Sequence, residues 1–180
     1  PSSVVMVIGG GMIGQLMIQL AKLVGAYKII LLEPVAVKRE MGRKLGADIC
    51  IDSIHEDVSK ILKENQVTRI NTVIECAGLP ETIKQAIVFA GKKSTVMMFG
   101  LTKPDATVDI KPFELFEKEI VLKASFINPY TQQRALDLIN AKKVDVRSMV
   151  CDCLGMEGLI EVLNSPEMRA KGKYIISPWK

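Results

Sequence analysis

Residues 4–14 read VVMVIGGGMIG, an apolar run followed by a cluster of glycines. Gly9, Gly11 and Gly14 fit the pattern G-x-G-x-x-G, and the run Val4–Ile8 before them is continuous and rich in β-branched residues. Such a run is typical of a strand buried on both faces of a parallel sheet. The residues after the glycines place apolar side chains at helical spacing, which predicts a strand, a tight turn and a helix.

A second apolar run, Lys28–Leu32 (KIILL), is followed at once by Glu33, which comes 19 residues after Gly14. This spacing is that of a βαβ unit that binds a dinucleotide. We expect Gly9 to make the turn out of the strand and Gly11 to let a pyrophosphate approach the backbone. Gly14 lets the helix close on the sheet, and the first N–H groups of that helix face the phosphates.

Glu33 also bears on the choice of cofactor. A carboxylate at this position accepts hydrogen bonds from both ribose hydroxyls, whereas it repels a 2′-phosphate by roughly 4 kcal/mol at about 4 Å and an effective dielectric constant near 20. Lys38 and Arg39 follow closely and would weaken this repulsion. We expect Arg39 to lie on a solvated helix face. The sequence therefore favours NAD over NADP, with NADP as the alternative.

The bulk composition indicates a globular domain. The chain has 180 residues, of which 48% are hydrophobic and 24% charged, and its net charge is +4. This charge is mild and scattered, so we expect no nucleic-acid partner, and the apolar runs are too short for a transmembrane helix. The start lacks an initiator Met and a basic leader segment. We expect a piece of a longer, cytoplasmic protein that does not act on membranes.

The cysteines do not form a pattern typical of a disulfide framework or a zinc site. We expect Cys50, Cys76, Cys151 and Cys153 to be buried or half-buried thiols, with the last two facing the same way on a strand. The single histidine, His55, lies in a polar stretch and is expected in a solvated loop. No residue of the chain is predicted to bind a metal or to act as a catalytic group.

Short apolar runs alternate with helical patterns along residues 1–127, which predicts an α/β fold of the Rossmann type, a doubly wound, parallel, six-stranded sheet between two helical layers. We expect a dinucleotide-binding domain over 1–127 and a separate C-terminal segment over 128–180. Beyond the first two strands, further strands are expected at 48–51, 72–76, 94–99 and 120–125, with helices at 34–45, 56–64, 80–90 and 112–118. In the C-terminal segment we expect helices at 131–140 and 156–163 and strands at 144–151 and 173–176.

Several stretches along nearly the whole chain resemble one family, the medium-chain, zinc-dependent alcohol and polyol dehydrogenases of the sorbitol and threonine dehydrogenase kind. The matching stretches are VMVIGGGMIGQLMIQLAKLVGA, KIILLE, RKLGAD, TVIECAG, TIKQAI, PFELFEKEI and SFINPYTQQRALDLI. The resemblance implies an oxidoreductase that transfers a hydride between an alcohol or polyol and NAD. It also implies a return of the C-terminal segment to a catalytic domain that this chain does not contain.

The resemblance assigns cofactor contacts by position. The pyrophosphate would lie against Gly9, Gly11, Met12, Ile13 and Gly14, and the adenosine ribose against Glu33 with Lys38 beside it. The nicotinamide ribose would lie between two loops, Cys76, Ala77 and Gly78 on one side and Phe99, Gly100 and Leu101 on the other. The backbone of Ser125, Phe126 and Ile127 would hold the carboxamide.

In this family the catalytic zinc is bound by an amino-terminal domain, so its ligands are not expected here. We therefore expect the chain to bind NAD(H) without turnover. The resemblance also implies a homo-oligomer, a dimer or a tetramer, with Thr107–Ile110 as a possible interface strand. The alternatives are a free-standing NAD(H) sensor, a zinc-free NADPH-dependent quinone reductase and, more remotely, a methyltransferase.

Overall fold

The structure, a computed structural model, describes residues 2–127 and 130–180. The chain forms two compact units, residues 1–131 and Gln132–Lys180. None of the helices in the described ranges combines the length and the apolar composition that crossing a bilayer requires.

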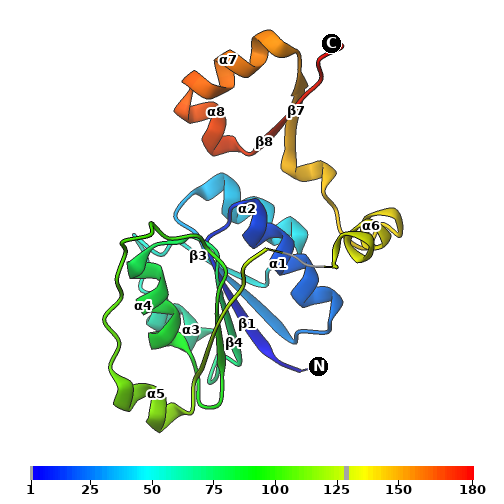
Figure 1. Cartoon of the computed structure of the whole chain (residues 1–180). Coiled ribbons are helices and arrows are strands. Elements are labelled where there is room, and N and C mark those ends of the chain that lie inside the picture. Colours follow the sequence, from blue (N-terminus) through cyan, green and yellow to red (C-terminus); the bar gives the residue numbers. More distant parts are fainter. Residues whose placement is uncertain (1, 128–129) are drawn as a thin grey trace. The chain divides into compact units, whose positions relative to one another are not determined.

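The first unit is built on a six-stranded sheet whose neighbouring strands all pair in parallel. The strand order is β3-β2-β1-β4-β5-β6. Figure 1 labels β3, β1 and β4 of this sheet. This order confirms the expected doubly wound Rossmann-type sheet. The strands are β1 (Val4–Ile8), β2 (Lys28–Leu32), β3 (Ile49–Ile51), β4 (Thr72–Glu75), β5 (Thr95–Met98) and β6 (Val121–Ala124).

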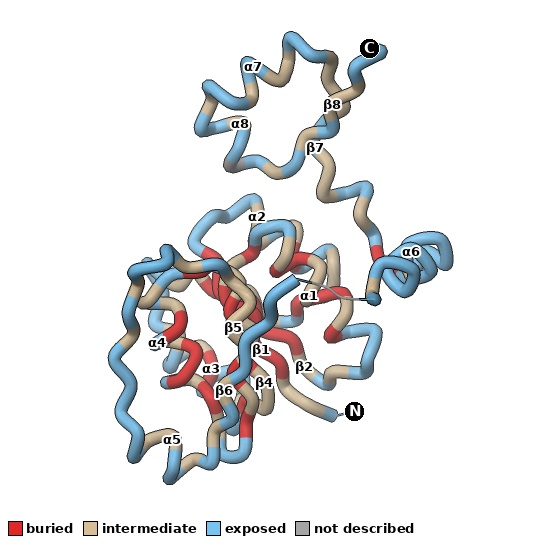
Figure 2. Tube along the Cα trace, viewed as in Figure 1, coloured by how far each residue is buried: buried red, intermediate tan, exposed pale blue. Residues whose placement is uncertain are grey.

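Helices cover both faces of this sheet, because successive side chains of the central strands point to opposite faces. Val7 of β1 belongs to one apolar cluster with Ile18 of α1, whereas Ile8 belongs to the other cluster with Ala86 of α4. Figure 2 shows buried residues along the central strands and on the helices beside them. The helices of this unit are α1 (Met12–Leu23), α2 (Ala36–Leu45), α3 (Val58–Glu64), α4 (Pro80–Phe89) and α5 (Pro112–Lys118).

The strand order reverses direction between β1 and β4. From β1 the chain proceeds to β2 and β3 on one side, then returns to β4 on the other side. The loops after β1 and β4 therefore diverge from adjacent strands, which is where open α/β sheets bind ligands.

The second unit contains a parallel pair of strands, β7 (Val150–Leu154) and β8 (Lys173–Ile176), joined through two helices (Figure 1). A β-bulge between Val150 and Asp152 interrupts the alternation of side chains in β7. The remaining elements are α6 (Gln132–Asn140), the 3-10 turn η1 (Arg147–Met149), α7 (Met156–Asn164) and α8 (Pro166–Lys171). The sequence did not predict α8.

The prediction of a strand over 144–151 was wrong for residues 144–149, because β7 begins only at Val150. The side chain of Asp145 accepts hydrogen bonds from the backbone N–H groups of Arg147 at 2.9 Å and Ser148 at 3.1 Å. These bonds close a turn, and the N–H groups are no longer available for a strand ladder. Val144 and Val146 are β-branched and alternate with a polar residue, which is typical of a strand, but the turn closed by Asp145 prevents one from forming.

Thr107–Ile110, the possible interface strand, forms no strand within this chain. Its pairing with a second copy stays a prediction. In the described sheet, β5 is paired with β6. The described edge on that side is β6 itself.

Candidate functional site

The loop between β1 and α1 has the shape that its glycines predict. Gly9 has a φ of +97°, a left-handed conformation that glycine adopts without strain. A Cβ on Gly14 would stand 1.9 Å from the carbonyl oxygen of Gly9, so only glycine lets α1 approach the end of β1 this closely. A Cβ on Gly11 would meet nothing within 4 Å. The outer face of Gly11 is thus open at the N-cap of α1.

Glu33 points at this loop. It follows β2 and is only 4% exposed. Its Oε2 accepts a hydrogen bond from the N–H of Gly10 at 2.6 Å, and its Oε1 accepts one from the N–H of Val35 at 2.9 Å. Each carboxylate oxygen still has a lone pair that a hydroxyl donor can use. The acid and the glycine loop therefore form one unit across adjacent strands.

Two residues of this unit were missed by the sequence analysis. Gly10 was treated as a spacer, but a Cβ there would stand 2.9 Å from Cγ of Glu33. Gln15, in the first turns of α1, is buried and donates from Nε2 to the carbonyl oxygens of Gly10 at 3.0 Å and Lys38 at 2.9 Å. Gln15 therefore connects the loop to α2. In the sequence, only its polarity on an otherwise apolar helix face could have indicated this role.

Arg39 does not lie on a solvated helix face, and that expectation was wrong. Its Nη1 donates to the carbonyl oxygens of Glu33 at 2.8 Å and Pro34 at 2.7 Å, and it lies 3.1 Å from Oδ2 of Asp52. The short backbone turn after β2 leaves two carbonyl groups unpaired within reach of α2, and they hold the guanidinium. The neighbouring Lys38 is half-buried.

Asp52 lies in the loop after β3 and anchors Arg39. Burial opposes ionisation of this carboxyl group. The hydrogen bonds from His55 and from the backbone of Ile54, together with the charge of Arg39, nevertheless hold the pKa of Asp52 below its usual value. His55 itself is exposed in the turn, which confirms the expected position, and its Nδ1 lies 3.2 Å from Oδ2 of Asp52.

The loops after β4 and β5 lie against each other at the same edge. A Cβ on Gly100 would stand 2.2 Å from the nitrogen of Gly78, and a Cβ on Gly78, whose φ is +73°, would stand 2.4 Å from the oxygen of Leu101. The structure thus brings the segments Cys76–Gly78 and Phe99–Leu101 together. Ala77 and Leu101 are exposed on this surface, Leu101 to 91%.

Cys76 is half-buried, as expected for a structural thiol. Burial, together with the negative charge of Glu75, raises the pKa of Cys76 to about 12. The thiol is therefore protonated at neutral pH. Cys50 and Cys153 are also half-buried, but Cys151 beside the bulge in β7 is exposed, which contradicts the expectation for that residue.

The segment that was expected to hold the carboxamide lies after β6. Ser125, Phe126 and Ile127 are all exposed, Phe126 to 84%, and Ile127 has a φ of +58°. A β-branched residue in this left-handed region is strained. Met12 and Ile13, the first two residues of α1, are exposed and half-buried respectively.

These features fit a dinucleotide. The open face of Gly11 leaves space against the first turn of a 12-residue helix, whose free N–H groups and positive dipole end favour phosphate oxygens. By contrast, the described residues include no group of three or more His, Cys, Asp or Glu placed to hold a metal ion.

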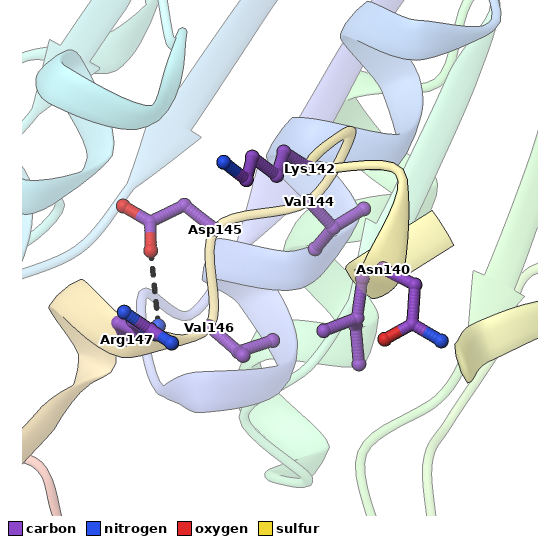
Figure 3. Close-up of a pocket in the computed structure, with 7 residues that line it drawn as sticks. Asn140, Lys142, Val144, Asp145, Val146 and Arg147 are labelled. Carbon is purple, nitrogen blue, oxygen red and sulfur yellow. Dashed lines mark hydrogen bonds between the residues drawn. The ribbon is translucent and has the colours of Figure 1, made fainter. Parts of the chain in front are cut away.

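A surface pocket of about 580 Å³ in the second unit has no predicted cofactor residue among those lining it. Figure 3 shows its side chains, with the carboxylate of Asp145 bonded to the backbone of Arg147. The residues lining it are Ile139, Asn140, Lys142, Val144, Asp145, Val146 and Arg147. They include no nucleophile paired with a general base.

Comparisons with known proteins agree with this geometry. The chain is 27% identical over 182 residues to D-arabinitol dehydrogenase 1 of Uromyces fabae, covering 99% of this chain and 52% of the relative. It is 33% identical over 134 residues to L-threonine 3-dehydrogenase of Caldanaerobacter subterraneus, covering 74% of this chain and 37% of the relative. The chain thus spans about a third to a half of the length of these relatives.

A solved structure, of a provisionally named zinc-binding dehydrogenase from Sinorhizobium meliloti 1021 bound to NADP, matches with 31% identity and a TM-score of 0.90. The match covers 98% of this chain and 53% of that one. The sequence profile described as "Zinc-binding dehydrogenase" matches residues 12–141, which is most of the chain and includes α1 and the loops after β2, β4 and β5. The chain therefore belongs to the zinc-binding dehydrogenase family.

Proposed function

We propose that this chain is the cofactor-binding portion of an NAD-dependent alcohol or polyol dehydrogenase that oxidises a secondary alcohol. The observation that carries the proposal is the bond from the N–H of Gly10 to Glu33, beside the open face of Gly11. This bond supports the proposal because it joins Glu33, which would bind the ribose, to the loop that would hold the phosphates. The relatives named for D-arabinitol and L-threonine support a small hydroxylated substrate.

The strand order determines which residues would hold each half of the cofactor. Glu33 follows β2 and would accept hydrogen bonds from the adenosine ribose, and the loop Gly9–Gly14 after β1 would hold the diphosphate. The second nucleoside then extends to the other side of β1, over the loops after β4 and β5. When bound, NAD supplies the nicotinamide ring that accepts a hydride from the substrate carbon.

In this proposal zinc belongs to the remainder of the parent protein. A zinc ion polarises an alcohol oxygen as a Lewis acid and needs three protein ligands with an open position. The described residues provide no such set. We therefore expect the 180-residue chain to bind cofactor but not to oxidise alcohols, even with added zinc.

The preference for NAD over NADP rests on charge. The carboxylate of Glu33 would face a 2′-phosphate at short range, and Arg39, one of two nearby cations, is occupied by Asp52 and two carbonyl oxygens. The relative from Sinorhizobium meliloti is bound to NADP. Cofactor choice is therefore the sharpest test of the proposal.

Isothermal titration calorimetry with NADH and NADPH tests it directly. The wild-type chain should bind NADH at least tenfold more tightly than NADPH, because about half of a 4 kcal/mol repulsion already exceeds the 1.4 kcal/mol of a tenfold difference. Glu33→Gln should reduce this preference. Glu40→Gln removes the same charge from an exposed position on α2 and should leave the preference unchanged. Tighter binding of NADPH by the wild type would point to the quinone reductase alternative, and binding of neither would overturn the proposal.

The proposal extends to a homo-oligomer, a dimer or a tetramer, in the cytoplasm. The supporting observations are an unpaired edge at β6 within the described sheet and four free thiols, which suit a reducing compartment. Size-exclusion chromatography with light scattering measures the mass directly. A monomer at all concentrations would contradict an interface built from this part of the protein.

A further inference from the structure

A fully buried carboxylate, Glu75, ends β4 beneath the loops that follow β4 and β5. We propose that Glu75 is a positioning residue that holds these two loops together, so that the nicotinamide half of the cofactor meets a fixed surface. Because none of its surface is exposed, Glu75 acts through the loops and not by touching the cofactor. The inference rests on the proposed function and adds a residue to it.

One carboxylate oxygen of Glu75 organises the turn after β4. Its Oε1 accepts hydrogen bonds from the backbone N–H groups of Ala77 at 2.7 Å and Gly78 at 2.8 Å, and from the hydroxyl of Thr82 at 2.8 Å. Thr82 lies in the first turn of α4. The side chain therefore bends the loop back over the end of its own strand and ties it to the helix that follows.

The backbone of the same residue holds the second loop. The carbonyl oxygen of Glu75 accepts hydrogen bonds from the N–H groups of Phe99 and Gly100, both at 2.9 Å. Gly100 and Gly78 pack so closely that neither position has room for a side chain. A displacement of either loop must therefore move the other, and Glu75 is bonded to both.

The side chain of Glu75 is an acid in a fully buried position. A buried charge is costly unless it is paired, and no basic side chain in the described ranges forms an ion pair with Glu75. Its Oε2 is buried without a hydrogen-bond partner. Its Oε1, by contrast, accepts bonds from Ala77 and Gly78 at 2.7 and 2.8 Å. These bonds give the buried side chain its compensation, and they fix the loop to the end of β4.

The strand order explains why only half of the cofactor should depend on Glu75. The adenosine ribose and the diphosphate are assigned to the loops after β2 and β1, which make no hydrogen bond to the Glu75 side chain. The remaining half lies over β4 and β5, where Ala77 and Leu101 form the exposed surface. Loss of the Glu75 bonds should therefore weaken the binding of NADH but not that of ADP, which has only the adenosine and the diphosphate.

Isothermal titration calorimetry of the 180-residue chain with NADH and with ADP separates the contributions of the two halves of the cofactor. Glu75→Ala should raise the Kd for NADH about tenfold and Thr82→Val about threefold, while the Kd for ADP changes less than about twofold. Glu75→Gln keeps an accepting oxygen and should restore most of the NADH affinity. Ser94→Ala is the matched control, because Ser94 is also fully buried with an unpartnered oxygen but precedes β5 at the opposite edge.

Each outcome of this calorimetry either supports or overturns the positioning role of Glu75. A selective loss for NADH that Glu75→Gln repairs and Ser94→Ala does not reproduce supports the positioning role. An unchanged ratio of the two affinities, or equal weakening of both ligands, overturns it while leaving the proposed function intact. If Glu75→Ala does not fold, Thr82→Val decides by the same ratio. If the wild-type chain binds neither ADP nor NADH, the proposed function and this inference fall together.

Discussion

Two alanine substitutions in the glycine loop should separate folding from cofactor binding. A Cβ on Gly14 would stand 1.9 Å from the oxygen of Gly9, whereas real Cβ contacts essentially never fall below 3.0 Å. The backbone must therefore move by about 1 Å, and such overpacking costs about 3 kcal/mol, offset by about 1 kcal/mol from the better helix propensity of alanine. Gly14→Ala should lose about 2 kcal/mol, or roughly 4–8 °C in Tm.

Gly11→Ala should behave in the opposite way. Its φ of −67° is open to any residue and its Cβ would meet nothing within 4 Å. Alanine is a poorer N-cap residue than glycine, which lowers the free energy of unfolding by about 0.5 kcal/mol. It also reduces the conformational entropy of the unfolded chain, which raises the free energy of unfolding by about the same amount. The new methyl group, however, occupies the space proposed for the diphosphate. Loss of two charge-assisted hydrogen bonds at about 1.5 kcal/mol each would raise the Kd for NADH about a hundredfold.

Thermal unfolding followed by circular dichroism and titration with NADH measure the two effects on the same samples. Unchanged NADH affinity in Gly11→Ala would show that the phosphates do not approach this face of the loop. A Gly14→Ala protein as stable as the wild type would refute the close approach of α1 to β1.

Two further predictions concern charged and titrating groups. In Asp52→Asn, Arg39 loses the carboxylate 3.1 Å away, so its charge becomes available to a 2′-phosphate, and calorimetry should show NADPH gaining roughly tenfold relative to NADH; an unchanged ratio would mean that Arg39 does not face the phosphate. The raised pKa of Cys76 predicts stability that is complete below the ordinary thiol value of 9.0 and lost as the pH rises through about 12. Urea unfolding in this range should show that the free energy of unfolding of the wild type falls by about 1 kcal/mol per pH unit and that Cys76→Ala abolishes this dependence. The same pH dependence in Cys76→Ala as in the wild type would contradict the burial of the thiol.

The sequence predicted those parts of the structure that depend on local patterns. Continuous apolar runs gave the central strands β1 and β2, and the glycine spacing identified the turn into α1. Local patterns failed where a side chain competes with the backbone for hydrogen bonds. Asp145 turned a segment with the β-branched residues Val144 and Val146 into a 3-10 turn.

By itself, then, the sequence determined the fold class and the place where a dinucleotide is expected, because strand burial and glycine geometry are properties of a few adjacent residues. Only the tertiary structure decided which groups support that place. The bonds between Gly10 and Glu33, between Arg39 and Asp52, and from Glu75 to both loops join residues that the parallel sheet brings to one edge. The number of residues between the partners of these bonds follows no regular period, because it depends on the lengths of the helices and loops between them. Sequence patterns therefore do not reveal these pairs.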